Sequence, residues 1–298
     1  MENQHRTLKI GNSVFEWGKQ TYLMGIINAT PDSFSGDGLF GSSTPKSDWV
    51  DMAVERGMQQ EKEGAHILDV GGESTRPGST PLPLEDELAR VIPVIKKLST
   101  HVRIPISIDT YKSEVARRAI EAGASIINDV WGGRMDSEIL RVAEGCDVPI
   151  VLMHNRSQPK NADQQEKLGG RYVGMEYDDV IDDIKRELQE SIDAALAAGL
   201  SQEKIIIDPG IGFGKTVEQN LELVRRMNEL LNLKYPILVG PSRKSFVGYT
   251  LNLPPTERLE GTAAAVALCI DRGADIVRVH DVDSMNRVAK LTDAIVRG

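Results

Sequence analysis

The sequence has few residues of the kinds that crosslinks and metal centres require. It contains two cysteines and five histidines in 298 residues, and aromatic residues make up 5%. Cys146 and Cys269 lie far apart, and no Cys-x-x-Cys or His-x-x-His pair occurs, so neither a zinc site nor a redox site is expected. Both cysteines are expected to be reduced, buried hydrophobic residues.

Long apolar runs and an excess of positive charge are also missing. No apolar run approaches the roughly 20 residues that a helix needs to cross a bilayer. The first five residues have neither the charged start nor the apolar stretch of a signal peptide, so we expect a cytoplasmic protein with no membrane partner. The net charge of -9 argues against binding to nucleic acid. It does not argue against an anionic substrate, because a site can be locally basic.

Eight short apolar runs alternate with helix-like stretches along the chain. Most of them are nearly continuous in apolar residues, as in parallel strands that are buried on both faces. They are residues 22–28, 66–70, 104–109, 125–130, 149–154, 205–208, 236–240 and 275–280. Helical periodicity marks residues 84–98, 180–196 and 221–231, and Pro93 is expected to interrupt and kink the first of these helices.

This alternation predicts an α/β fold, specifically a (β/α)8 barrel. We expect one domain over residues 1–298, with the barrel core at 18–298, and an open doubly wound sheet is the alternative. Residues 8–17 predict a short N-terminal β-hairpin around Gly11-Asn12 that covers the bottom of the barrel. Residues 156–177 are a long polar stretch, which we interpret as a mobile excursion rather than a second domain.

Polar residues follow all eight predicted strands. In a barrel these positions meet at the C-terminal rim, where active sites lie. The positions are Asn28, Glu73 to Thr75, Asp109, Asn128, His154 and Asn155, Asp208, Ser242 to Lys244, and His280. Asp109, Asn128 and Asp208 could accept hydrogen bonds from a flat heterocycle that is rich in N–H groups.

A basic set at the same rim could hold phosphate oxygens. Its members are Arg76, Arg243, Lys244, Arg278 and His280. For each arginine a surface ion pair is an equal alternative. The stretch from Gly210 to Thr216 is similar to a phosphate-binding loop, but Pro209 replaces its first glycine. We therefore interpret it as a turn in which Phe213 leans over the rim.

Seven short motifs, each at the end of a predicted strand, together resemble the dihydropteroate synthase family. They are Asn28-Ala29-Thr30-Pro31-Asp32-Ser33-Phe34-Ser35, Gly71-Gly72-Glu73-Ser74-Thr75-Arg76-Pro77-Gly78, Ser107-Ile108-Asp109-Thr110, Ile127-Asn128-Asp129, Asp208-Pro209-Gly210-Ile211-Gly212-Phe213, Ser242-Arg243-Lys244-Ser245 and Arg278-Val279-His280-Asp281. The chain departs from the family at Gly36-Asp37-Gly38, where many relatives have Asp-Gly-Gly. No role is therefore carried over to Asp37.

The resemblance implies a reaction and a set of residues for it. The family condenses 6-hydroxymethyl-7,8-dihydropterin diphosphate with 4-aminobenzoate to give 7,8-dihydropteroate and pyrophosphate, with Mg²⁺ as the cofactor. By analogy, the pterin would be bound by Asp109, Asn128, Met153, Asp208, Phe213 and Lys244. The diphosphate would be bound by Asn28, Thr75, Arg278 and His280, and Asn28 would also help to hold Mg²⁺. The aminobenzoate would be bound by Phe34, Arg76, Pro77, Lys244 and Ser245.

By the same analogy, the catalytic residues would be Asp109, Lys244, Arg278 and His280. We expect dissociative substitution without an enzyme nucleophile, in which a fixed carboxylate stabilises the pterinylmethyl cation. The resemblance further implies a homodimer and competition by sulfonamides, which mimic 4-aminobenzoate.

Two other functions are open alternatives. A pterin-binding methyltransferase shares the barrel and the Asp/Asn/Asp set but has no diphosphate to hold, so the motif from Ser242 to Ser245 argues against it. A catalytically silent pterin-binding barrel would be suggested by gaps among the charged rim residues, and the sequence has none.

Overall fold

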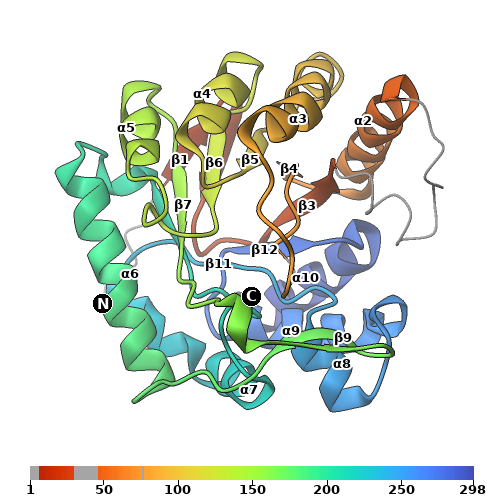
Figure 1. The fold of residues 1–298 in the computed structure, drawn as a ribbon, viewed down its shortest axis with the longest axis vertical. Coiled ribbons are helices and arrows are strands. Elements are labelled where there is room, and N and C mark those ends of the chain that lie inside the picture. The colour runs from red at the N-terminus through yellow and green to blue at the C-terminus, as the bar shows by residue number, and fades with distance from the viewer. Residues whose placement is uncertain (1–6, 30–45, 76) are drawn as a thin grey trace.

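Eight parallel strands form a closed barrel in the computed structural model, which describes residues 7–29, 46–75 and 77–298 (Figure 1). The strands are β3 (Tyr22–Asn28), β4 (Ile67–Gly71), β5 (Ile106–Asp109), β6 (Ile126–Asp129), β7 (Ile150–Met153), β10 (Ile205–Asp208), β11 (Leu238–Val239) and β12 (Ile276–Val279). Their order in the sheet is β10-β7-β6-β5-β4-β3-β12-β11. A parallel bridge between Ile207 and Ile237 joins the first strand to the last. The barrel is confirmed, and the open sheet is excluded by this closure.

Helices surround the strands on the outside of the barrel (Figure 1). They are α2 (Lys46–Glu63), α3 (Leu84–Leu98), α4 (Ser113–Glu121), α5 (Glu138–Gly145), α6 (Val180–Ala197), α7 (Val217–Arg226), α8 (Ser245–Leu251), α9 (Leu259–Asp271) and α10 (Val282–Val296). Short 3-10 helices lie at η1 (Pro159–Asn161), η2 (Gln202–Lys204), η3 (Met227–Leu233) and η4 (Pro255–Glu257). No helix in the described ranges is long and apolar enough to cross a membrane.

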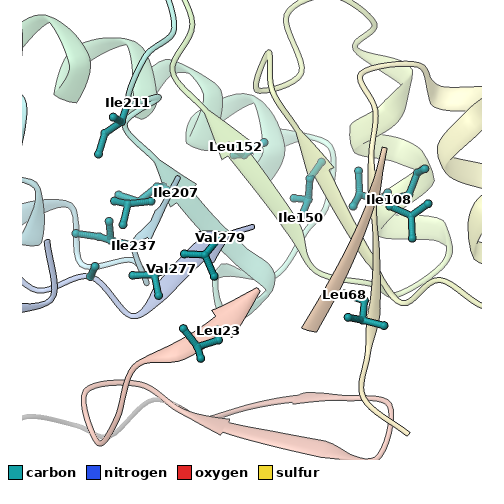
Figure 2. Close-up of a cluster of buried hydrophobic side chains, with 14 of the residues drawn as sticks. Leu23, Leu68, Ile108, Ile150, Leu152, Ile207, Ile211, Ile237, Val277 and Val279 are labelled. Carbon is teal, nitrogen blue, oxygen red and sulfur yellow. The ribbon is translucent and has the colours of Figure 1, made fainter. Parts of the chain in front are cut away.

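The main hydrophobic core lies between the strands and the helices. Alternate residues of each strand point outward into it, because successive side chains of a strand face opposite sides. Figure 2 labels members from six strands and two adjoining positions: Leu23, Leu68, Ile108, Ile150, Leu152, Ile207, Ile211, Ile237, Val277 and Val279. The same alternation turns the side chain of Asp69 into the barrel, because it lies between the outward-facing Leu68 and Val70.

The predicted N-terminal hairpin is confirmed as β1 (Thr7–Ile10) and β2 (Ser13–Glu16). Its apolar residues join the inward-facing residues at the N-terminal ends of the barrel strands in a second buried cluster. That cluster comprises Leu8, Ile10, Phe15, Trp17, Tyr22, Met24, Ile67, Ile126, Val151, Ile206, Leu238 and Ile276. The ring of Phe15 lies 4.7 Å from that of Tyr22 and 5.6 Å from that of Trp17. The hairpin therefore closes the bottom of the barrel, as predicted.

Several local predictions were wrong. Helix α3 continues through Pro93 without interruption. The helix predicted at 221–231 changes to the 3-10 helix η3 at Met227. Cys269 is buried as predicted, but Cys146 is exposed.

The polar excursion at 156–177 is folded. It contains the antiparallel strands β8 (Ala162–Gln165) and β9 (Gly169–Tyr172). The Tyr249 hydroxyl donates to the Gly169 carbonyl at 3.0 Å, and the Arg258 guanidinium donates to the Leu168 carbonyl at 2.8 Å. These bonds fix the β8–β9 hairpin beside α8, where Figure 1 shows β9.

Candidate active site

A cavity of about 510 Å³ opens at the carboxyl ends of the barrel strands. Eight of the predicted site residues line it: Asn28, Thr75, Pro77, Asp109, Lys244, Ser245, Arg278 and His280. The β8–β9 hairpin, which the sequence did not assign to the site, contributes Gln164, Leu168, Gly169 and Gly170 to the wall. We call this space the rim cavity.

An acidic network surrounds Arg278 at the base of the rim cavity. The Arg278 Nη2 donates to Asp109 Oδ2 at 2.7 Å, and its Nε donates to Asp69 Oδ2 at 2.6 Å. The same Asp69 oxygen accepts a hydrogen bond from the Asn128 Nδ2 at 3.0 Å. Asp109 and Asn128 are therefore close together at the ends of β5 and β6, as predicted, but they are joined through Asp69, which the sequence did not identify.

Burial makes the two predicted carboxyls hard to ionise. It raises the pKa of Asp109 to about 7, against the opposing effect of the Arg278 and Lys244 cations. It also raises the pKa of Asp208 to about 6, although the Gly210 N–H donates to the Asp208 Oδ1 at 2.7 Å and stabilises the carboxylate. A ligand rich in N–H groups that pairs with these carboxylates would therefore stabilise their ionised forms, which burial disfavours.

An apolar face lies next to these acceptors. Met153 and Phe213 are buried with Val130 in a small cluster of their own, separate from the two larger cores. The Lys244 ammonium lies 3.9 Å from the centre of the Phe213 ring, a cation–π contact. None of Met153, Phe213, Asn128 and Asp208 is among the residues that line the rim cavity, so these four predicted residues lie behind its visible wall.

The predicted basic set divides into two. Lys244, Arg278 and His280 line the rim cavity, and the His280 Nδ1 lies 3.0 Å from the Ser242 Oγ. Arg243 also borders the cavity, but its Nε and Nη2 bind both carboxylate oxygens of Asp281 at 3.0 and 2.7 Å. For Arg243 the ion-pair alternative is therefore the better description.

The predicted aminobenzoate residues fall partly inside the described chain. Pro77 and Ser245 both line the rim cavity, and the Gln164 Nε2 donates to the Pro77 carbonyl at 2.5 Å. Phe34 and Arg76 lie outside the described residues, as does Asp37.

This site has relatives among known proteins. Residues 24–280 match a family model described as pterin binding enzyme. The dihydropteroate synthase of Clostridium beijerinckii is 47% identical over 97% of this chain and 100% of the relative, and that of Bacillus subtilis is 43% identical over 99% and 95%. The chain belongs to the dihydropteroate synthase family.

Solved structures of dihydropteroate synthases have the same fold. A Clostridium difficile enzyme, determined in the presence of pteroic acid, is 46% identical and superposes with a TM-score of 0.85 over 95% of this chain and all of that chain. A Xanthomonas albilineans enzyme in complex with 7,8-dihydropteroate is 36% identical, with a TM-score of 0.81 over 97% of this chain and 98% of that chain.

The sequence did not indicate one residue of this dihydropteroate synthase site, because the stretch from Gly210 to Thr216 does not match a phosphate-binding loop. Lys215 follows the glycine-rich turn and is almost completely buried. Its ammonium lies 3.0 Å from each of three acceptors: the carbonyls of Gly210 and Phe213, and the His154 Nδ1. Burial lowers the pKa of Lys215 to about 7 and that of His154 to about 3. Lys215 therefore fixes the turn that carries Phe213.

A second lysine fixes another segment of the dihydropteroate synthase site. The Lys112 Nζ donates to Glu73 at 2.6 Å, to Glu87 at 2.5 Å and to the Leu82 carbonyl at 2.7 Å. Glu73 lines the rim cavity, and its Oε2 also accepts the Leu82 N–H at 3.2 Å. Both ends of the segment after β4, which carries Thr75 and Pro77, are thus held to the barrel.

Proposed function

We propose that this chain condenses 6-hydroxymethyl-7,8-dihydropterin diphosphate with 4-aminobenzoate, giving 7,8-dihydropteroate and pyrophosphate. The observation that carries the proposal is the arrangement of the rim cavity. The acceptor Asp109 and three basic residues, Lys244, Arg278 and His280, line it, and the buried acceptors Asn128 and Asp208 lie behind its wall. One end of this arrangement suits a heterocycle and the other suits a diphosphate. Related enzymes have been solved with pteroic acid, 4-aminobenzoic acid and 7,8-dihydropteroate, which supports the same substrates here.

The pterin would lie at the base of the cavity. Asp109 and Asp208 would each accept N–H groups of the pyrimidinone edge, and the Asn128 amide oxygen would accept another. Lys244 would donate to a ring oxygen or nitrogen, while Met153 and Phe213 would pack near the ring. Each of these contacts is strengthened by the exclusion of water from the barrel interior.

The reaction would be a dissociative substitution at the exocyclic methylene of the pterin. The bond between the methylene carbon and the diphosphate oxygen breaks, and the electron pair leaves with pyrophosphate. Asp109 would stabilise the cation that spreads into the ring, and Arg278, His280 and Thr75 would bind the leaving oxygens. The amine of 4-aminobenzoate then forms the new C–N bond, and its surplus proton passes to water. The neutral arylamine needs no covalent enzyme intermediate.

The residues present fit a magnesium ion that is bound mainly by substrate. The described chain has no group of three or more acidic, histidine or cysteine side chains that could hold a metal by itself. Mg²⁺ commonly uses one or two protein oxygens and completes its shell with water and phosphate. Asn28, at the end of β3 and on the cavity wall, would supply such an oxygen. When bound, the ion would neutralise charge on the diphosphate.

The aminobenzoate would enter beside Pro77 and Ser245, with Phe34 and Arg76 completing the pocket. Sulfonamides have the same shape and would compete for this pocket. A Yersinia pestis dihydropteroate synthase has been solved with a sulfonamide drug complex.

We also propose a homodimer. The exposed apolar side chains of Leu268 on α9 and of Leu291 and Ile295 on α10 support it. A cytoplasmic location is part of the proposal.

Pyrophosphate release tests the function. Purified protein is given the pterin diphosphate and Mg²⁺, with and without 4-aminobenzoate. We expect release that depends on 4-aminobenzoate, an equal amount of dihydropteroate, and loss of both in Asp109→Asn. Pterin binding without release would favour the silent barrel, and methyl transfer from a methylated folate to a corrinoid protein would favour the methyltransferase.

A further inference from the structure

Asp69 is a buried carboxylate that contacts one residue of the proposed pterin site, Asn128, and one of the proposed diphosphate site, Arg278. It lies on β4, its side chain is 0% exposed, and it points into the barrel. Its Oδ2 accepts from the Arg278 Nε at 2.6 Å and from the Asn128 Nδ2 at 3.0 Å. Its Oδ1 is buried and accepts no hydrogen bond from any residue in the described part of the chain.

Stability does not explain a carboxylate at this position. A buried charge is costly unless its hydrogen bonds are complete, and one oxygen of Asp69 lacks a partner among the described residues. Ile67, two residues earlier and facing the same way, shows that the barrel interior accepts an apolar side chain on this strand. The carboxylate is therefore better explained by what it does to Arg278 and Asn128.

The bond to Asn128 sets the orientation of the amide. Because a carboxylate accepts hydrogen bonds and cannot donate them, Asn128 must turn its NH₂ group towards Asp69. Its amide oxygen then lies on the other side of the planar group. That orientation supplies an acceptor for an N–H of the pterin.

The bond to Arg278 has a different consequence. In this structure the Arg278 Nη2 occupies Asp109 Oδ2, one of the oxygens that the pterin would need. The pterin must therefore replace one end of the guanidinium on Asp109. The other end, Nε, has a separate partner in Asp69 and can stay bound during the exchange.

We propose that Asp69 is a positioning residue of the pterin site, which anchors Arg278 while the pterin replaces it on Asp109 and which orients the Asn128 amide. This inference rests on the proposed function, because it requires a pterin at Asp109. The anchored guanidinium would then stay beside the exocyclic methylene of the pterin, the carbon that pyrophosphate leaves.

Replacing Asp69 with Asn keeps the size of the side chain and removes its charge. Arg278 would then pair more strongly with Asp109, and the Asn128 amide would no longer be fixed. We expect the dissociation constant of 6-hydroxymethylpterin to rise about tenfold or more, because a charge-assisted hydrogen bond has been lost from each partner.

The pH dependence of pterin binding gives a second measure that a merely structural role would not change. Four charged groups act on Asp109: Arg278 from β12, Asp69 from β4, Glu87 from α3 and Lys244 from the segment after β11. The negative charge of Asp69 raises the pKa of Asp109 and the positive charge of Arg278 lowers it. Asp69→Asn should therefore move the loss of binding to lower pH, and Arg278→Gln should move it to higher pH.

The experiment measures the pterin dissociation constant by calorimetry from about pH 5.5 to about pH 8 in the full chain. Asp275→Asn is the matched control, because Asp275 is also a buried carboxylate, accepts from Gly18 and Ile237, and lies at the opposite end of β12. Urea unfolding establishes that each variant is folded. If Asp69→Asn does not fold, Arg278→Lys replaces it, because one ammonium cannot reproduce the separate bonds of Nε to Asp69 and of Nη2 to Asp109, and it should then weaken pterin binding in the same way.

Opposite pH displacements in the two variants, with weaker binding in Asp69→Asn and neither effect in Asp275→Asn, would support the inference. A dissociation constant within about twofold of the wild-type value, or displacements in the same direction, would overturn it. The assay uses the pterin ring alone, so a wild-type chain that binds pterin but forms no dihydropteroate would contradict the proposed function and leave this comparison valid.

Discussion

Binding of the pterin ring should weaken as the pH falls, because two of its proposed acceptors are buried carboxyls with raised pKa values. The pKa of Asp109 is about 7 and that of Asp208 is about 6. A carboxyl with a raised pKa gains its proton at a higher pH. The ionised acceptors are thus lost between neutral and mildly acidic pH, where an exposed aspartate would remain ionised.

The size of the effect follows from these two values. With a pKa of about 7, the ionised fraction of Asp109 falls about tenfold between pH 8 and pH 6. With a pKa of about 6, that of Asp208 falls about twofold over the same interval. If both carboxylates must be ionised, the pterin dissociation constant should rise about twentyfold.

Calorimetry with 6-hydroxymethylpterin is the suitable assay, because this ligand has no diphosphate whose own protonation would contribute. Asp109→Asn should bind weakly at both pH values and keep only the twofold change from Asp208. A wild-type dissociation constant that is the same at pH 6 and pH 8 would refute the assignment of these carboxylates as the pterin acceptors.

Three further predictions concern single residues. Lys215→Met should weaken pterin binding and lower the urea midpoint, since it leaves buried acceptors without a donor; unchanged values of both would show that Lys215 does not support the Phe213 turn. Phe15→Ala should lower the free energy of unfolding by about 3–5 kcal/mol in urea denaturation. Val14→Ala is the control and should have little effect, because the neighbouring Val14 is 59% exposed. Equal effects of the two substitutions would contradict the account of the closed barrel bottom. Gln164→Ala should raise the KM for 4-aminobenzoate in steady-state assays, because it removes the hydrogen bond to the Pro77 carbonyl, and should leave the KM for the pterin diphosphate unchanged. Equal changes in both KM values would contradict a role of the β8–β9 hairpin in the aminobenzoate pocket.

The barrel was predictable from the sequence because its strands are continuous apolar runs. The predicted bounds of β3 and β10 agree with the structure, as both runs end at a polar residue where the strand ends. The strand predicted at 236–240 is reduced to β11, Leu238–Val239. Pro236 has no N–H to donate, and the Ile237 N–H is taken by Asp275 at 3.0 Å.

The β8–β9 hairpin could not be predicted in the same way. Its strands contain Gln164, Gln165, Gly169 and Gly170 and have no apolar alternation. It is held by contacts to distant parts of the chain, such as the bond from Tyr249 to Gly169. A local pattern carries no information about such partners.

The site was partly predictable for a related reason. Strand ends indicated Asp109, Asn28 and His280, because a parallel barrel brings those ends together. Asp69 lies inside β4, two residues before the strand ends, so it is not among the strand-end residues. The alternation of β4 could have identified it, since a charged residue there must face the barrel interior.

The fate of the bridging oxygen tests the central claim most directly. The pterin diphosphate is prepared with ¹⁸O between the methylene carbon and the first phosphorus, and the products are analysed by mass spectrometry after reaction with 4-aminobenzoate and Mg²⁺. We predict unlabelled 7,8-dihydropteroate and an equal amount of pyrophosphate that carries all of the label. Labelled 6-hydroxymethyl-dihydropterin as the main product, with no dihydropteroate, would mean that the chain breaks the P–O bond and would contradict the proposed reaction.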